Sequence, residues 1–281
     1  MNKITKAIIP VAGWGTRRLP ITKAIEKCML PIGNRPIVDY IVEDCVRAGI
    51  TDIYFVINET EHSQLKDYYG QNAQIEKFLL DKNATDKLEL LKTAPDNVNF
   101  HYAVQPDGKY GTALAVATAI KEFNLDEQVA MRNGDDPFWG TPGGSEMKNF
   151  LSKINSSDES AIIGVEKPRA EMPKYGMLVV EDGFLQEIIE KPAIENVTSN
   201  LANVNGYVLS AKLLQMIVGY VDENDFGPND QEYLVVEPVT EYVKSGNPMR
   251  VIPATGEWLD SGSLDGWLHA NEVISRDLLK S

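Results

Sequence analysis

A glycine-containing turn follows the first apolar run of the sequence and is itself followed by positive charge. The run over residues 4–11 leads into Ala12, Gly13, Gly15 and Thr16. Glycines at such a place let the backbone approach a nucleotide closely and point N–H groups at phosphate. This arrangement indicates a site for an anionic ligand.

The charges of residues 14–35 support this interpretation. The segment contains one anion, Glu26, and five cations, which are Arg17, Arg18, Lys23, Lys27 and Arg35. A solvated basic face would also explain such a run. Its place after a glycine turn, at the edge of a parallel sheet where ligands bind, favours an anion site instead. We expect Arg17 to cross the phosphates and Arg18 to point to solvent.

Carboxylates occur at two further points where a strand is expected to end. Asp135 and Asp136 follow the apolar stretch 128–133, and Asp260 lies in a Trp-Leu-Asp-Ser-Gly-Ser segment. Mg²⁺ prefers carboxylate, phosphate and water oxygens, so acids beside a phosphate loop are suited to hold it. A simple turn would account equally well for Asp-Asp-Pro.

The cysteines and histidines offer less chemistry. Cys28, Cys45, His62, His101 and His269 show no spacing typical of a metal site. Cys45 shares a helical face with apolar residues, which indicates a core position. Cys28 lies in the basic segment and could be a reactive thiol, but a packed bystander is the favoured interpretation.

Strand and helix patterns alternate through the first half of the chain. We expect strands, helices and an inserted charged segment, in the order strand 4–11, helix 36–48, strand 53–57, helices 63–69 and 75–80, insertion 81–92, strand 98–104, helix 112–123 and strand 128–133. This alternation predicts a doubly wound α/β fold, with a Rossmann-like, mostly parallel sheet and helices on both faces.

The second half has a different pattern. We expect strands at 161–166, 176–180, 184–190, 203–209 and 249–253, and helices at 233–243 and 264–279. Asp182-Gly183 is typical of a hairpin turn, which predicts antiparallel additions to the sheet. No linker is evident, so residues 1–281 are expected to form a single domain. Residues 1–140 would be its nucleotide-binding half and residues 141–281 its sugar-binding half.

Composition narrows the class of protein further. The chain has 281 residues, 43% of them hydrophobic, and a formal charge of −14. This excludes wholesale disorder and makes nucleic acid an improbable partner. No apolar run is long enough for a membrane span and no signal peptide is evident, so we expect a cytoplasmic protein. We also expect a homo-oligomer.

The segment VAGWGTRRLPITKAIEKCMLPIGNRPIVDYIVED, residues 11–44, resembles the opening of the sugar-1-phosphate nucleotidylyltransferases. The likeness is greatest to the bacterial UTP–glucose-1-phosphate uridylyltransferases and continues in blocks to Gly266. It implies the nucleotide-diphospho-sugar transferase fold. The implied reaction joins a nucleoside triphosphate, most simply UTP, to a hexose 1-phosphate such as glucose 1-phosphate, and releases pyrophosphate.

The resemblance also implies roles for individual residues. The nucleotide would be bound by Ala12, Gly13, Gly15, Thr16, Arg17, Lys27, Gln105 and Gly111. The sugar phosphate would be bound by Tyr175, Gly176, Glu190, Lys191 and Asn205. Mg²⁺ would be held by Asp135 and Asp260, and catalysis would depend on Arg17, Lys27, Asp135 and Lys191. A second Glu-Lys-Pro, at residues 166–168, precedes Tyr175 and is expected to have no role.

Several departures from the family pattern leave alternatives open. Glu26 replaces the usual proline, Cys28 the usual glutamate, and the loop before Gly111 is one residue longer. Arg132 and Asn133 stand where apolar residues and proline are usual, and the residues alone give no role for Arg132. Another base or sugar, such as dTTP, therefore stays possible. An NAD-dependent oxidoreductase lacks its third glycine here, and a catalytically inactive relative is disfavoured by the intact charged residues.

Overall fold

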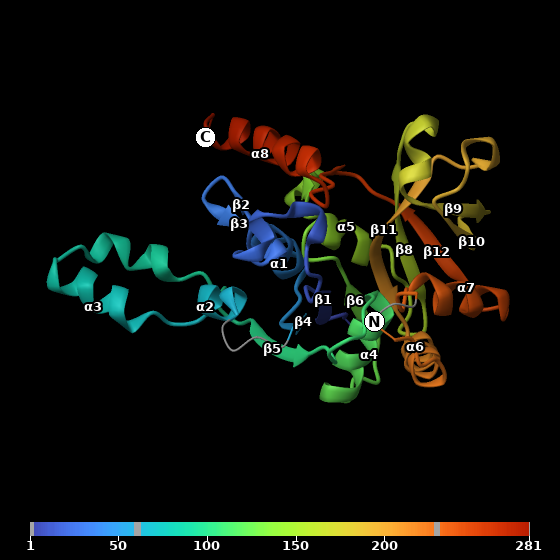
Figure 1. The fold of residues 1–281 in the computed structure, drawn as a ribbon, viewed down its shortest axis with the longest axis horizontal. Coiled ribbons are helices and arrows are strands. Elements are labelled where there is room, and N and C mark those ends of the chain that lie inside the picture. The colour runs from blue at the N-terminus through green and yellow to red at the C-terminus, as the bar shows by residue number, and fades with distance from the viewer. Residues whose placement is uncertain (1–2, 59–62, 228–230, 281) are drawn as a thin grey trace.

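The computed structural model describes residues 3–58, 63–227 and 231–280. His62, one of the histidines considered above, lies outside these ranges. Within them, nine strands form one sheet (Figure 1). In sheet order these are β5 (Asn99–Val104), β4 (Asp52–Ile57), β1 (Lys6–Pro10), β6 (Val129–Met131), β11 (Leu201–Leu209), β8 (Ser160–Glu166), β12 (Met249–Pro253), β10 (Phe184–Glu190) and β9 (Gly176–Glu181).

The direction of the strands changes in the middle of the sheet. β1 pairs in parallel with β4 and β6, and β4 pairs in parallel with β5. β11 then runs antiparallel to both β6 and β8, while β8 and β12 are parallel. β9 pairs with β10 and also with β11, so this edge of the sheet folds back on itself. The predicted α/β sheet with antiparallel additions in its second half is confirmed.

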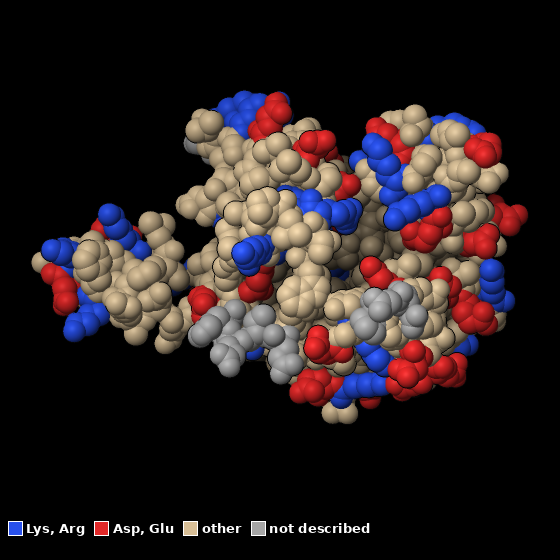
Figure 2. Space-filling view, viewed as in Figure 1, with Lys and Arg blue, Asp and Glu red and all other residues tan. Residues whose placement is uncertain are grey.

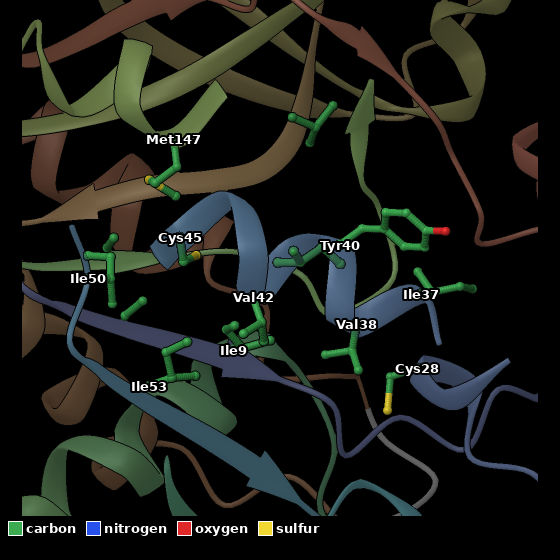
Figure 3. Close-up of a cluster of buried hydrophobic side chains, with 14 of the residues drawn as sticks. Ile9, Cys28, Ile37, Val38, Tyr40, Val42, Cys45, Ile50, Ile53 and Met147 are labelled. Carbon is green, nitrogen blue, oxygen red and sulfur yellow. The ribbon is translucent and has the colours of Figure 1, made fainter. Parts of the chain in front are cut away.

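Helices cover both faces of the sheet, as predicted (Figure 1). They are α1 (Ile37–Ala48), α2 (Gln64–Tyr69), α3 (Ala73–Asp81), α4 (Thr112–Phe123), α5 (Glu146–Leu151), α6 (Ala211–Glu223), α7 (Val236–Lys244) and α8 (Leu264–Leu278). Because side chains alternate along a strand, Ile9 of β1 packs with α1, α5 and α8, and Ile8 packs with α4, α6 and α7. Figure 3 shows Ile9 and Ile53 beside Val38 and Val42 of α1.

Two short pairs of strands lie outside the main sheet. β2 (Pro31–Ile32) pairs with β3 (Arg35–Pro36), and β7 (Phe138–Trp139) pairs with β13 (Glu257–Trp258). The second pair is important for the site because it follows Asp135 on one side and precedes Asp260 on the other. It therefore brings the two predicted metal ligands to the same region of the molecule.

The predicted inserted segment forms an arm. α3 and the turns that follow it project away from the body of the molecule (Figure 1). No helix in the described part of the chain has the length and apolar character needed to cross a membrane.

Candidate active site

A cavity of about 380 Å³ opens where β1 and β6 end. It is lined by Pro10, Val11, Ala12, Gly13, Trp14, Gly15, Thr16, Lys27, Cys28, Gln105, Tyr110, Gly111, Thr112, Ala115, Asn133, Gly134, Asp135 and Glu232. In Figure 2, Lys and Arg side chains flank the hollow between the two halves of the molecule from both sides. A cavity at the carboxyl ends of parallel strands is the usual ligand site of such sheets.

The glycine turn is held in a conformation that a larger residue would strain. Gly15 has φ of 63°, and a Cβ there would lie 2.9 Å from the Thr22 side chain. The Thr22 hydroxyl donates a hydrogen bond to the Gly15 carbonyl, at 2.9 Å. The chain then enters a short 3-10 turn, Thr16–Arg18, and not an α-helix. The expected folded-back loop, which differs from a dinucleotide-binding turn, is confirmed.

Arg17 and Arg18 occupy opposite environments. Arg17 is exposed. A Cβ on Gly262 would lie 3.5 Å from Arg17 Nη2 and 3.0 Å from Asp260 Oδ1, so this guanidinium lies beside the second acid. The predicted orientation of Arg18 toward solvent is wrong: its exposed fraction is 3%.

The Arg18 guanidinium packs over the Trp267 ring of α8, 5.4 Å from its centroid. None of its three nitrogens has a hydrogen-bond partner among the described residues. Burial lowers the pKa of Arg18, and the nearby Asp135 and Asp260 only partly oppose this. Sequence periodicity could not reveal this position, because the ring that covers Arg18 lies at the far end of the chain.

Lys27 and Asp135 form an ion pair inside the cavity. Burial alone would lower the pKa of Lys27, but the carboxylates of Asp135 and Asp136 outweigh it and the pKa is raised. The ammonium is therefore a fixed positive charge. Its role toward a triphosphate stays a prediction.

Asp136 is the third acid of this region and is buried. Burial, together with Asp135 and Asp260, raises the pKa of Asp136 to about 8. Asn133 Nδ2 donates a hydrogen bond to one of its oxygens at 3.1 Å. The other oxygen, Oδ1, has no partner in the described part of the chain.

Arg132 has a structural role that the sequence did not reveal. Its Nη2 donates to the main-chain oxygen of Asp136 at 2.9 Å, and its guanidinium stacks on the Phe138 ring at 4.6 Å. Its Nη1 lies 3.7 Å from Asp44, whose carboxylate accepts the Met147 N–H at the start of α5. Arg132 thus holds the backbone of the acidic turn and its charge faces away from the cavity.

Asp260 reaches the same region from the other half of the chain. Its carboxylate accepts hydrogen bonds from the Gly262 N–H at 3.0 Å and from the Tyr175 hydroxyl at 3.4 Å. Burial, and then the charge of Asp260, raises the pKa of Tyr175 to about 12, which keeps this hydroxyl protonated as a donor. Tyr175 therefore connects the sugar-side residues to the acids.

The chemistry of these oxygen donors fits a hard divalent cation. Among the described residues, no three or more acids, histidines or cysteines are already arranged as a complete metal site. Asp135 and Asp260 approach from two sides, and Asp136 carries a buried oxygen without a partner. Mg²⁺ is commonly bound by one or two carboxylates together with substrate phosphates and waters. The residues present suit that incomplete type of site.

The base loop is shaped by a close backbone contact. Gly111 has φ of 129°, and a Cβ there would lie 2.3 Å from the Tyr233 carbonyl oxygen. The Tyr233 N–H donates to the Tyr110 carbonyl, and the Ala113 N–H donates to the Tyr233 carbonyl, each at 2.8 Å. Gln105 is buried at the start of the loop, and its Nε2 donates to the Lys109 carbonyl at 3.0 Å. Gln105 also lines the cavity, and its role toward a base stays a prediction.

On the sugar side, Gly176 and Glu190 fit against each other. A Cβ on Gly176 would lie 2.6 Å from Glu190 Oε1, so the carboxylate occupies the space that any side chain would need. Burial raises the pKa of Glu190, and Lys191 partly opposes the effect. Lys191 is exposed, has φ of 44°, and donates its N–H to the Tyr175 carbonyl at 3.0 Å.

Asn205 lies in an irregular stretch of β11, between Asn203 and Tyr207, where the register with β8 shifts. Its φ is 51°, and its side-chain oxygen accepts hydrogen bonds from the Tyr207 hydroxyl at 3.2 Å and from Asn203 at 3.4 Å. The amide is therefore held by its own strand. Its role toward a sugar stays a prediction.

The cysteines are core residues, as favoured. Cys28 and Cys45 are both buried, and burial raises the pKa of each thiol. Figure 3 shows Cys45 on α1 near Met147, and Cys28 in the neighbouring loop near Val38. Cys28 also lines the edge of the cavity, and a raised pKa disfavours the thiolate there, which favours a packed residue over a reactive thiol.

The structure brings most of the predicted nucleotide residues into one cavity. Ala12, Gly13, Gly15, Thr16, Lys27, Gln105, Gly111 and Asp135 all line it. The sugar-side residues are not part of that lining and are joined to it through Tyr175 and Asp260. Trp14, Tyr110 and Glu232 also line the cavity but were not predicted. Trp14 and Tyr110 lie inside the predicted loops, whereas nothing in the sequence around Glu232 indicated a site.

The sheet, the glycine loop, the base loop and the two acids together define a nucleotide-binding α/β protein. The residues predicted to bind the sugar phosphate lie next to this site, around Tyr175 and Asp260. Residues 6–277 match the family model described as nucleotidyl transferase, and the chain belongs to that family.

Similar proteins are known in sequence and in structure. The chain is 36% identical over 234 residues to the UTP–glucose-1-phosphate uridylyltransferase of Bacillus subtilis, which covers 81% of this chain and 76% of the relative. It is 32% identical over 273 residues to UTP–glucose-1-phosphate uridylyltransferase 1 of Staphylococcus saprophyticus. That alignment covers 95% of this chain and 91% of the relative. The UTP-bound UGPase from Acinetobacter baumannii superposes with a TM-score of 0.85 at 28% identity, over 96% of this chain and 93% of that one.

Proposed function

We propose that this chain is a UTP–glucose-1-phosphate uridylyltransferase, which joins UTP to glucose 1-phosphate and releases pyrophosphate. The observation that carries the proposal is the Lys27–Asp135 ion pair inside a cavity built by the glycine and base loops. A fixed cation and an acid at the end of β6 suit a nucleotide phosphate chain. The names of the similar proteins support UTP and glucose 1-phosphate as substrates.

The mechanism follows from the placement of these groups. Gly13, Gly15 and Thr16 approach the phosphates with their backbone, and Gln105 faces the base. On the other wall, Glu190 and Lys191 bind the sugar phosphate. The phosphate oxygen attacks the α-phosphorus in line, a P–O bond forms, and the bond to the leaving pyrophosphate breaks.

No covalent intermediate on the protein is needed, because the nucleophile is already an anion. The protein contributes position and charge neutralisation. Arg17, beside Asp260, and Lys27 stabilise the charge that develops on the leaving pyrophosphate. Mg²⁺, held by Asp135 and Asp260, would supply further neutralisation of the phosphate oxygens when it is bound.

The test is a matrix of nucleoside triphosphates crossed with sugar 1-phosphates, with pyrophosphate release as the readout. We expect UTP with glucose 1-phosphate to be the best pair and dTTP to be used less well.

Activity should disappear with a chelator and return with excess Mg²⁺. Asp135→Asn should be inactive while its circular dichroism stays native, because among the described residues the ion pair of this side chain is with Lys27 in the cavity and not with the core. A better rate with another base or sugar would correct the substrate, and full activity of Asp135→Asn would remove its role.

Partners and location belong to the same proposal. UTP and sugar phosphates are metabolites of the cytoplasm, so we place the enzyme there, with no nucleic-acid or membrane partner. We further propose a homo-oligomer, which light scattering on the purified chain would test directly.

A further inference from the structure

Lys167 lies against the aromatic residues next to Asp260, although its Glu-Lys-Pro motif is expected to have no role. The residue directly follows β8, and its N–H donates to the Asn200 carbonyl at 2.9 Å. Its ammonium lies 4.8 Å from the centroid of the Trp258 ring and 5.9 Å from that of Tyr175. The side chain is therefore placed over two aromatic rings.

Both rings belong to the candidate active site. Tyr175 and Trp258 meet edge to face, with centroids 5.4 Å apart. The Tyr175 hydroxyl donates to Asp260, and Trp258 precedes that acid by two residues. The Lys167 ammonium is thus one aromatic ring away from a proposed metal ligand.

The charge of Lys167 is oriented but not neutralised. Among the residues that the structure describes, no carboxylate forms an ion pair with it. The attraction of a cation to an aromatic face is modest, so it orients the ammonium without cancelling its charge. An ammonium held in this way remains available to an anion.

A second lysine flanks the same tyrosine. The Lys191 N–H donates to the Tyr175 carbonyl, while the Lys167 ammonium covers the Tyr175 ring. The nucleotide loop carries two other cations, Arg17 and Lys27. Both lysines therefore contact Tyr175, Lys167 through its ammonium and Lys191 through its backbone.

We propose that Lys167 binds the phosphate of the sugar 1-phosphate together with Lys191. This inference rests on the proposed function and names a further binding residue for its second substrate. An ammonium is a compact charge that suits a phosphate oxygen better than a sugar hydroxyl. The effect of its loss should be confined to the sugar phosphate.

The experiment compares Lys167→Met with Lys174→Met. Lys174 is an exposed lysine that ends the neighbouring 3-10 turn, and its ammonium lies over no aromatic ring of the described residues. We expect Lys167→Met to raise the KM for glucose 1-phosphate about tenfold to a hundredfold, the effect of losing one charge-assisted contact. The KM for UTP and the thermal midpoint should stay unchanged. Lys167→Arg should restore most of the affinity, and Lys174→Met should behave as wild type.

Calorimetric binding of glucose 1-phosphate to the wild-type chain and to Lys167→Met gives a reading that does not depend on turnover. Equal dissociation constants, or a parallel rise in the KM for UTP, would overturn the role of Lys167. Absence of turnover by the wild-type chain, with glucose 1-phosphate still bound more weakly by Lys167→Met, would overturn the proposed reaction and leave the phosphate contact in place.

Discussion

Arg17 and Arg18 are consecutive in the glycine loop, yet only one of them can meet a ligand. Arg17 is exposed beside Asp260, and Arg18 is buried over Trp267. The two adjacent arginines therefore differ in role: Arg17 is available to a ligand, and Arg18 packs inside the protein. Substitutions at the two positions should separate function from stability.

At position 17 the expected effect is on turnover. A guanidinium can hold a phosphate with two parallel hydrogen bonds, which an ammonium cannot copy. We expect Arg17→Lys to lower kcat about tenfold to a hundredfold and to weaken UTP binding less, because the contact strengthens as charge moves onto the leaving group. Steady-state kinetics with saturating Mg²⁺ and direct UTP binding check this. Equal losses in kcat and binding would show a uniform contact instead.

At position 18 the expected effect is on stability. The Arg18 nitrogens have no hydrogen-bond partner in the described structure, and burial disfavours the charged form. Replacing a buried, unpaired polar group by an apolar one of similar length removes a cost of about 1–3 kcal/mol. We expect Arg18→Met to raise the free energy of unfolding by that amount in urea denaturation. A large loss of stability would show that an anion or water satisfies this guanidinium.

The residues of the site that could be predicted are those whose signal is local. Gly13, Arg17 and Lys27 follow one strand in a single loop, and the resemblance could be placed on them directly. The burial of Arg18 and the orientation of Arg132 depend on Trp267 and Asp44, which lie far away in the sequence. Order along the chain favours Glu190-Lys191 over Lys167, but order does not show which side chains lie close together in the fold.

At the scale of elements, the base loop is defined by how closely it approaches the segment at Tyr233. A Cβ on Gly111 would collide with the backbone there, whereas a Cβ on Gly108, with φ of 73°, meets nothing within 4 Å. The two glycines share one loop but only one is constrained by its neighbour. They form a matched pair for testing the loop.

We expect Gly111→Ala to destabilise the protein by about 2–4 kcal/mol, because the loop must move away from Tyr233. Gly108→Ala should cost only about 1–2 kcal/mol, the price of a left-handed conformation for a residue with a side chain. The KM for UTP should rise in Gly111→Ala alone. Urea denaturation and kinetics measure both effects, and indistinguishable variants would show that the loop is not fixed by this contact.

Two of the predicted helices agree closely with the structure. α4 has the predicted bounds, Thr112–Phe123, and α1 ends at Gly49, which adopts a left-handed φ of 92°. α5 and α6 were not predicted. α5 is only six residues long, and its buried Glu146 accepts hydrogen bonds from Thr255 and Gly256. Such an element is stabilised by distant backbone groups and leaves no periodic signal.

At the scale of the whole molecule, the formal charge of −14 contrasts with the cations around the cleft. An acidic body disfavours polyanions, while the cations of the glycine loop and sugar-side wall attract small phosphates locally. The overall α/β class could be predicted from the alternation of strands and helices. The fold-back of β9 onto β11 could not, because it depends on pairing between distant strands.

The two halves of the chain share one sheet and one set of cores, and this should make them unfold together. β6 of the first half pairs with β11 of the second, and both core clusters contain residues from each half, such as Ile9 with Ile163 and Ile8 with Ile162. No boundary therefore separates them within the described ranges. The expectation of a single domain stays a prediction, and it has a direct test.

We expect urea unfolding followed by circular dichroism and by tryptophan fluorescence to give one coincident transition. UTP with Mg²⁺ at a hundred times its Kd should raise the free energy of unfolding by about 2.7 kcal/mol. Because the sheet continues from β6 into β11, that stabilisation should move the signals of both halves by the same amount. Tryptophan fluorescence, to which Trp258 on the sugar side contributes, should show the same stabilisation as the circular dichroism of the whole chain. Two separated transitions, with UTP shifting only the first half, would show that residues 1–140 and 141–281 are independent folding units.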